Sequence, residues 1–498
     1  MFRNTLAQAV TFLSAQVYSF LLAPIMIDRL GLTLFGVWTV VGAIANYISV
    51  LDPGITRALS RFVALYDSSD DRRSIQECMG LGLLTITAIT ALLLPIAWFA
   101  GPLLAHLLGH LDSAQMRQVL LAQAVIFVVQ GYSGVVQGLP QGLRRTVPAN
   151  AAVVLGNTTN FGASVTALFL GHSLVRYAWF NAGAETIGAI LVVTTIPLVW
   201  RGNFARIPSR RIVRQVLAYS LRSQISWLAD VVNLQTDKLV IGLLVSPAAA
   251  GIYQLASSIA SAVRNLGVIS IGMMIPTTAA AIATEGRAAV RRMAVRYMPL
   301  VLGVSLPIFV LTALGAPFVF TLWIGPIGHH GVVPVLIALD VVYAINLATG
   351  VPSTVALADG RTDLTSRNAI YMAGSNALLT LALAPVFGLA GVVAGTVVAL
   401  GSFSIVFIVR FARTYELTLA DMRRAIEPAA LLAVIAGVPF VAPVLAAAHL
   451  GDTRVRAGVL LVTLVACYVA VYWPLASWLG ILPQRLALRW PAKPSAAA

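Results

Sequence analysis

The 498-residue chain is 59% hydrophobic and only 10% charged, whereas soluble domains carry about 25% charged residues. This composition excludes an ordinary soluble protein. The formal net charge of +15 could indicate nucleic acid as a partner, but the arginines occupy short segments between apolar runs, where they orient a membrane protein. We therefore expect no nucleic-acid partner.

Apolar runs of about 20 residues, each long enough to cross a bilayer, recur from end to end. They predict an all-α polytopic membrane protein with fourteen membrane-spanning helices. The predicted spans are 5–27, 35–55, 77–100, 117–138, 148–170, 177–199, 220–245, 250–283, 297–323, 331–357, 368–387, 389–411, 427–447 and 457–480. The first span follows Met1 almost directly, so we expect no cleavable signal peptide. Cys78 and Cys467 lie in or beside separate runs, which argues against a disulfide framework.

Alternate loops differ in charge. The basic set contains Arg57, Arg61, Arg72, Arg73, Arg144, Arg145, the arginines of 201–214, Arg287, Arg291, Arg292, Arg296, Arg361, Arg367, Arg410, Arg413, Arg423 and Arg424. The opposite set contains Arg29, Arg117, Arg176, Arg454 and Arg456. The positive-inside rule makes the first set cytoplasmic. An even number of spans then puts both termini in the cytoplasm, and the expected location is the bacterial inner membrane.

An internal repeat indicates how the spans are grouped. At an offset of about 215 residues, Gly36 matches Gly251 and Trp38 matches Tyr253. The offset covers an even number of spans, so the copies share one orientation and form a parallel repeat. The predicted parts are an N-terminal six-helix lobe (1–200), a basic cytoplasmic linker (201–219), a C-terminal six-helix lobe (220–413), an appended helix pair (414–481) and a basic cytoplasmic tail (482–498).

Polar residues recur at matching positions of the repeat. The matched pairs are Thr39 with Gln254 and Asn46 with Ser261 on spans 2 and 8, Gln130 with Asn346 on spans 4 and 10, and Asn160 with Asn376 on spans 5 and 11. Polar stripes do not face lipid. Hydrogen bonding and close packing between helices account for the Ser and Gly positions. For the Asn and Gln positions we favour a shared aqueous cavity that binds the substrate.

Cationic residues accompany these stripes. Lys238 on span 7 and Arg264 on span 8, joined by Arg57, Arg61 and Arg222 near the cytoplasmic ends of spans 2 and 7, predict a cationic chamber. Such a chamber suits a cargo that carries pyrophosphate. Two alternatives remain open. The three inner arginines could be interface anchors, and Lys238 could form a structural ion pair with Asp230 or Asp237.

The carboxylates within the spans are Glu185, Asp230, Asp237 and Asp340. Intramembrane carboxylates are typical of proton and ion pathways, so these four are candidates for coupling; partnership with a nearby Arg or Lys is the alternative for each. The adjacent His329 and His330 lack metal-ligand spacing. Catalytic and phosphate-loop signatures are also absent. We predict no metal, no cofactor and no enzymatic activity.

Two segments resemble a known family. "LDPGITRALSRFVALY" (51–66) is similar to the end of span 2 in Wzx-type oligosaccharide flippases, and "TDKLVIGLLVSPAAAGIYQLA" (236–256) is similar to their helix 7–8 junction. These flippases belong to the multidrug/oligosaccharidyl-lipid/polysaccharide (MOP) exporter superfamily. The resemblance implies two six-helix lobes with a cationic lumen, which move an undecaprenyl-pyrophosphate-linked glycan to the periplasmic leaflet by alternating access. A polysaccharide polymerase is a further expected partner.

Four functions remain as hypotheses. A flippase for lipid-linked oligosaccharide agrees best with fourteen spans and inner arginines. A cation-coupled multidrug exporter of the same superfamily usually has twelve spans, and a lipid II flippase would carry more charges in its first lobe. A membrane glycosyltransferase or polymerase would carry a sizeable outer loop, which the sequence lacks.

Overall fold

The protein is helical throughout the part of the chain that the structure describes. This computed structural model describes residues 2–51, 54–272, 278, 281–282, 284–325 and 331–481, and within them it contains helices but no strand. A bilayer offers no water to backbone groups, so a chain this apolar satisfies them within helices. The predicted fold class, an all-α polytopic membrane protein, is confirmed.

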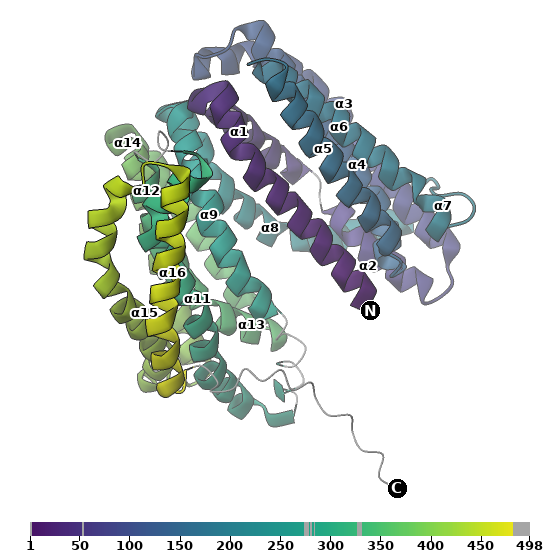
Figure 1. The fold of residues 1–498 in the computed structure, drawn as a ribbon. Helices are drawn as coiled ribbons and strands as arrows, with labels where there is room; N and C mark the ends of the chain where they lie inside the picture. Colours follow the sequence, from purple (N-terminus) through teal and green to yellow (C-terminus); the bar gives the residue numbers. More distant parts are fainter. Residues whose placement is uncertain are drawn as a thin grey trace. The chain divides into compact units, whose positions relative to one another are not determined.

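Figure 1 shows the α-helices of the described residues. They are α1 (Phe2–Ile48), α2 (Ile55–Asp67), α3 (Arg72–Leu108), α4 (Ser113–Gly142), α5 (Val147–Phe169), α6 (Leu174–Thr194), α7 (Ile196–Val199), α8 (Arg210–Leu244), α9 (Pro247–Gly272), α11 (Arg287–Trp323), α12 (Val332–Leu347), α13 (Gly350–Ala358), α14 (Thr362–Thr414), α15 (Leu419–Ala447) and α16 (Arg454–Trp478).

Two glycines divide the longest helices. Gly31 in α1 has a φ of 80° and Gly388 in α14 has a φ of 58°, so each helix consists of two segments joined at a residue that only glycine fits easily. In the described part of the chain, each predicted span overlaps a helix or half-helix, with α12 and α13 together corresponding to the tenth. Within the described residues, nine helices are long and apolar enough to cross a membrane. Helices α5, α8 and α9, which carry many of the polar residues singled out above, are not among them.

Contacts divide the chain into two compact units. The first contains Met1–Leu255 and Ala369–Ala399, and the second contains Ala256–Asn368 and Leu400–Ala498. In the first unit α3 packs against α4, α5 against α6, and α1 against both α5 and α8; in the second, α11 packs against α12, α15 and α16. These units have other boundaries than the lobes predicted at 1–200 and 220–413, and the lobes stay a prediction.

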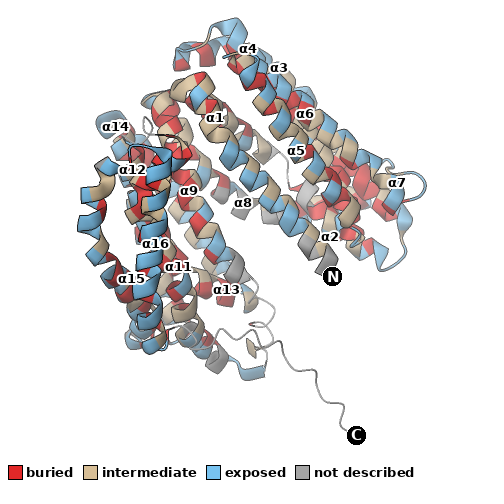
Figure 2. Ribbon diagram, viewed as in Figure 1, coloured by how far each residue is buried: buried red, intermediate tan, exposed pale blue. Residues whose placement is uncertain are grey.

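Tyrosine hydroxyl groups on α16 fasten this helix to α11 and to α15 within the second unit. The Tyr472 hydroxyl donates to the Gly303 carbonyl at 2.6 Å, and the Tyr468 hydroxyl donates to the Ala433 carbonyl at 2.9 Å. The opposite faces of α15 and α16 are exposed (Figure 2), with Leu445 and Val462 among their apolar side chains. Such faces fit contact with lipid.

The predicted linker 201–219 is only partly a loop. Helix α8 begins at Arg210, so the non-helical part ends at Ser209. The Arg206 N–H donates to the Gln76 carbonyl at 3.0 Å, and the Ser209 N–H donates to the Glu77 carboxylate at 3.0 Å. The Gln76 amide also donates to the Asn203 carbonyl at 2.8 Å. We call residues 201–209 the strap, because these bonds hold them on α3.

The basic segment after the second span is also more ordered than expected. Most of this segment is not a loop but helix α2. This helix is amphipathic, and its Leu59 and Val63 side chains are fully buried. Its buried face packs against α3, α4 and α8 within the first unit.

Candidate functional site

A buried carboxylate is the centre of the most elaborate polar cluster in the first unit. Asp237 on α8 is 1% exposed. It accepts hydrogen bonds from the Tyr253 hydroxyl at 2.6 Å, the Asn376 amide at 3.0 Å, the Thr380 hydroxyl at 3.1 Å and the Thr396 hydroxyl at 3.0 Å. We call these five residues the Asp237 cluster.

Four helical segments build the Asp237 cluster. Tyr253 lies on α9, Asn376 and Thr380 lie one turn apart before the Gly388 break in α14, and Thr396 follows that break. Burying an unpaired carboxylate is very costly, and each donor reduces that cost. All four donors are neutral, and the Lys238 ammonium forms no ion pair with Asp237. Neutral hydrogen-bond donors therefore stabilise the carboxylate but do not neutralise its negative charge. That charge can still attract a proton or a cation.

The oxygen atoms of the Asp237 cluster are of the types that bind a hard cation. The amide oxygen of Asn376 is buried and has no hydrogen-bond partner among the described residues. The Thr396 hydroxyl also lies 3.1 Å from the Val392 carbonyl oxygen. Carboxylate, amide, hydroxyl and carbonyl oxygens are the ligands of hard cations. In the part of the chain that is described, no group of three or more His, Cys, Asp or Glu side chains is placed to hold a metal.

The repeat partner of Asn376 also binds a carboxylate. The Asn160 amide on α5 donates to Glu185 on α6 at 2.9 Å. Glu185 and Gln130 line one cavity of about 220 Å³ between α4, α5 and α6. The structure thus brings together two predicted site residues, Glu185 and Gln130, inside the first unit. The matched asparagines each donate to an intramembrane carboxylate.

The predicted cationic residues occupy different surroundings. Lys238 is half-buried on α8 in the first unit, and no ion pair joins it to another described side chain. Arg264 is half-buried on α9 in the second unit, with its guanidinium 5.6 Å from the centre of the Tyr343 ring. Arg61 is exposed on α2, and its guanidinium lies 4.0 Å from the centre of the Tyr219 ring. A cation over an aromatic face is held in a defined orientation.

The predicted polar residues differ in exposure. Asn46 is exposed, and its amide donates to the Gly42 carbonyl of its own helix at 2.9 Å. Gln254 is half-buried on α9. Asn346 is half-buried on α12, and its amide donates to the Ser404 hydroxyl at 3.0 Å. Asp340, also on α12, is buried.

The side chains of Arg57, Arg222 and Asp230 lie outside the described residues, as do the adjacent His329 and His330. The predicted pairing of Lys238 with Asp230 therefore stays a prediction.

Sequence reasoning missed three members of the Asp237 cluster. Tyr253 stood in the repeat as the match of Trp38, but its role as a donor was not predicted. Thr380 and Thr396 carried no distinguishing signal, because threonine is common at helix contacts in membranes. The one available signal was the four-residue spacing of Asn376 and Thr380 on one helix face.

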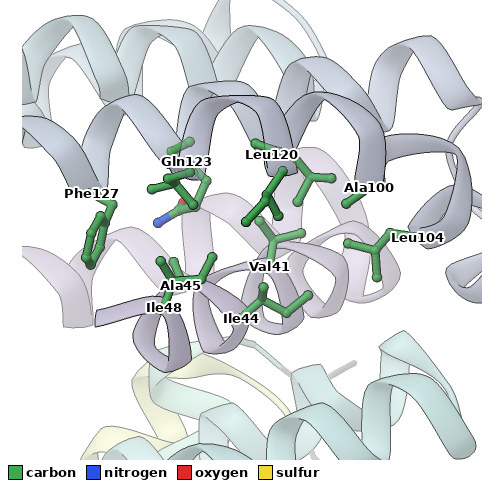
Figure 3. Close-up of a pocket in the computed structure, with 13 residues that line it drawn as sticks. Val41, Ile44, Ala45, Ile48, Ala100, Leu104, Leu120, Gln123 and Phe127 are labelled. Carbon is green, nitrogen blue, oxygen red and sulfur yellow. The ribbon is translucent and has the colours of Figure 1, made fainter. Parts of the chain in front are cut away.

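A second, smaller cavity in the first unit holds none of the predicted site residues. It measures about 50 Å³ and is lined by α1, α3 and α4, with Gln123 as its one polar side chain among apolar neighbours such as Val41 and Leu120 (Figure 3). Its size and lining exclude a glycan.

Comparisons with known proteins agree with this description. A family model described as polysaccharide biosynthesis protein matches residues 1–281. No curated protein sequence matches significantly.

Among solved structures, the lipid II flippase MurJ in an inward closed conformation is similar at 14% identity and a TM-score of 0.69, over 95% of this chain and 98% of that one. An inward-facing multidrug resistance MATE family transporter of the MOP superfamily is similar at 16% identity and a TM-score of 0.63, over 82% of this chain and 98% of that one. A MOP superfamily transporter from Pyrococcus furiosus is similar at 17% identity and a TM-score of 0.53, over 83% of this chain and 93% of that one.

Proposed function

Because the chain belongs to the polysaccharide biosynthesis protein family, we propose that it is a flippase for a polyprenyl-pyrophosphate-linked oligosaccharide. It moves this glycan from the cytoplasmic to the periplasmic leaflet of the bacterial inner membrane, for the synthesis of O-antigen, capsule or exopolysaccharide. The family match together with the MOP-type fold carries the proposal. Both termini are cytoplasmic, and a polysaccharide polymerase is the expected partner downstream.

The cationic residues supply the recognition of the cargo. Lys238 and Arg264, with Arg57, Arg61 and Arg222, bind the pyrophosphate through charge-assisted hydrogen bonds. Asn46, Gln254, Gln130 and Asn346 offer amide groups to the sugar hydroxyls. The absence of an ion partner for Lys238 among the described side chains supports its part in this set, because a lysine already paired would be a weaker phosphate ligand.

The Asp237 cluster supplies the coupling. A proton or a small hard cation bound to the Asp237 carboxylate changes the charge on α8 beside Lys238. An ion that binds one conformation better than another shifts the population between them. Glu185, Asp230 and Asp340 were further candidates for this role. Asp237 is preferred because α8, α9 and both segments of α14 all contribute to its surroundings.

A lipid II flippase is the second candidate. One observation favours it over a multidrug exporter: the MurJ structure covers 95% of this chain, whereas the MATE structure covers 82%. At 14% and 16% sequence identity, these structural similarities concern the fold alone. The multidrug exporter remains the third reading.

The proposal is tested by deleting the gene and measuring lipid-pyrophosphate-linked oligosaccharide together with surface polysaccharide. We expect the intermediate to accumulate and the surface glycan to disappear. The wild-type gene and Lys238→Arg should restore export, while Lys238→Ala should restore it poorly at equal protein level in the membrane. Accumulated lipid II would favour the second candidate, and altered sensitivity to cationic drugs without either intermediate would place the protein among multidrug exporters.

A further inference from the structure

The second unit contains an apolar pocket separate from the clusters described above. It has a volume of about 430 Å³, within the range of about 300–1,000 Å³ that is usual for small-molecule sites. Helices α11, α12 and α15 and the second segment of α14 line it, with side chains such as Leu306, Phe309, Ile408 and Ala430.

Asp340 is the exception in this apolar lining. It is 1% exposed, and both of its carboxylate oxygens are buried without a hydrogen-bond partner among the described residues. The other lining residues are all apolar. A carboxylate in such surroundings is strongly destabilised until a donor or a cation reaches it. Even a protonated carboxyl group would leave its hydroxyl and carbonyl unpaired. Asp340 thus lacks a hydrogen-bond partner among the described residues in both of its protonation states.

The residues around Asp340 limit which ligand can pair with its carboxylate. A bare metal ion would need several further oxygen ligands, and the other lining side chains offer none. The rim includes Val341, Ile405 and Val434, which are 52%, 57% and 57% exposed. They belong to a helix surface of the type that lipid covers. The occupant therefore comes from the bilayer, has an apolar body and carries one positively charged donor.

We propose that this pocket binds a lipophilic amine, whose ammonium group pairs with Asp340 while its hydrocarbon part fills the space between α11, α12, α14 and α15. The pocket is a binding site in its own right, and its occupancy does not depend on glycan transport.

Binding is measured with radiolabelled N,N-dimethyldodecylamine on the purified full-length protein in phosphatidylcholine nanodiscs, with empty discs subtracting partition into lipid. We expect saturable binding at one site. Asp340→Asn should weaken it about tenfold or more, because a charged hydrogen bond is lost. Asp452→Asn, which changes an exposed carboxylate of the same unit, should leave it unchanged.

Two further measurements make the proposal decidable. Ala430→Phe fills the pocket from α15 without changing any charge, and it should also abolish saturable binding. This variant decides the matter if Asp340→Asn does not yield a monodisperse protein. 1-Dodecanol, which has the same chain without the amine, should displace the label at least tenfold more weakly than unlabelled amine. Equal binding by Asp340→Asn and wild type, or equal displacement by the alcohol and the amine, would overturn the proposal.

Discussion

Thr380 offers the sharpest test of the Asp237 cluster at the level of a single residue. Its hydroxyl donates to the carboxylate at 3.1 Å and the side chain is fully buried. Thr380→Val keeps the shape but removes the donor, and hydrogen bonds to charged groups contribute about 1.5–3 kcal/mol. We expect a lower melting temperature and reduced glycan export. Thr380→Ser should retain both. Wild-type melting and export in the valine variant would show that this donor is dispensable.

Asp71 predicts a dependence of stability on pH. It lies outside the spans and caps α3 by accepting hydrogen bonds from the Ser74 hydroxyl at 2.6 Å and from the Ser74 N–H at 3.0 Å. These bonds lower the pKa of Asp71. A lowered pKa means that the stabilisation is complete above the unfolded value of about 3.9 and is lost as the pH falls through the folded value.

Asp71→Ala should accordingly lower the melting temperature at pH 7, and its difference from the wild type should shrink progressively below about pH 4. Thermal scans of both proteins from pH 7 to pH 3 measure this. A difference that stays constant over the whole range would mean that the Asp71 charge contributes nothing.

The candidate site was only partly predictable at this scale. The sequence placed Asp237 within a span and matched Asn376 with Asn160, because both signals follow chain spacing. The other partners of Asp237 depend on how α8, α9 and α14 pack, which spacing along one helix does not reveal. Likewise, the sequence predicted Arg61 to be a cation near the cytoplasmic end of span 2, but its position over Tyr219 depends on how α2 packs against α8.

Among the elements, α16 depends on a hydrogen bond that substitution can remove cleanly. The Tyr472 hydroxyl donates to the Gly303 carbonyl of α11, and interhelical hydrogen bonds in membranes contribute about 0.6 kcal/mol on average. Tyr472→Phe should lower the free energy of unfolding by about that amount, as measured by unfolding in mixed micelles. Val462→Ala, on the exposed face of the same helix, is the control. Equal loss in both variants would contradict a specific role for the hydroxyl.

The strap gives a second prediction for an element. A Cβ atom on Gly80 would lie 1.8 Å from the Arg206 carbonyl oxygen, closer than any real contact, so α3 and the strap require glycine there. Gly80→Ala should push the strap away from α3. We expect faster cleavage within 201–209 by a protease added to the face predicted to be cytoplasmic, while Gly42→Ala, where the space is open, should not change it. An unchanged cleavage rate in Gly80→Ala would show that the strap is free of α3.

Apolar runs predicted the elements well where helices cross a membrane, since length and hydropathy set each span. They failed for α2, whose apolar positions from Ile55 to Tyr66 follow a helical period rather than a continuous run. The strap could not be predicted at all. Its hydrogen bonds use backbone groups, which every residue possesses, and only the glycine at position 80 hinted at a close approach.

For the whole molecule, the alternating loops predict an orientation that reporters can measure. The turn between α3 and α4 contains His110, and the turn between α4 and α5 contains Arg144 and Arg145. Alkaline phosphatase fused after His110 should be active because that turn is predicted to be periplasmic, and the same enzyme fused after Arg145 should be inactive. A fluorescent protein that matures only in the cytoplasm should give the opposite result. Activity of both phosphatase fusions would contradict the predicted topology.

The sequence predicted a polytopic membrane protein because composition, span length and loop charge are properties of many residues together. An error at one position therefore does not change the prediction. The division into two lobes is a different matter. It rests on weak matches between small and polar residues such as Gly36 and Gly251, which also recur in membrane helices for packing reasons. Residues 220–255 and 369–399 group with the first unit by contact, which chain order could not indicate.

The strap also has a mechanical meaning. A connection held at Asn203, Arg206 and Ser209 has no slack, so a displacement of α8 cannot be absorbed by a loose loop ahead of it. Because α8 begins directly after the strap, these bonds tie the start of the helix that carries Asp237 and Lys238 to the start of α3. Lengthening the strap by a few glycines would loosen this tie without changing any residue of the Asp237 cluster.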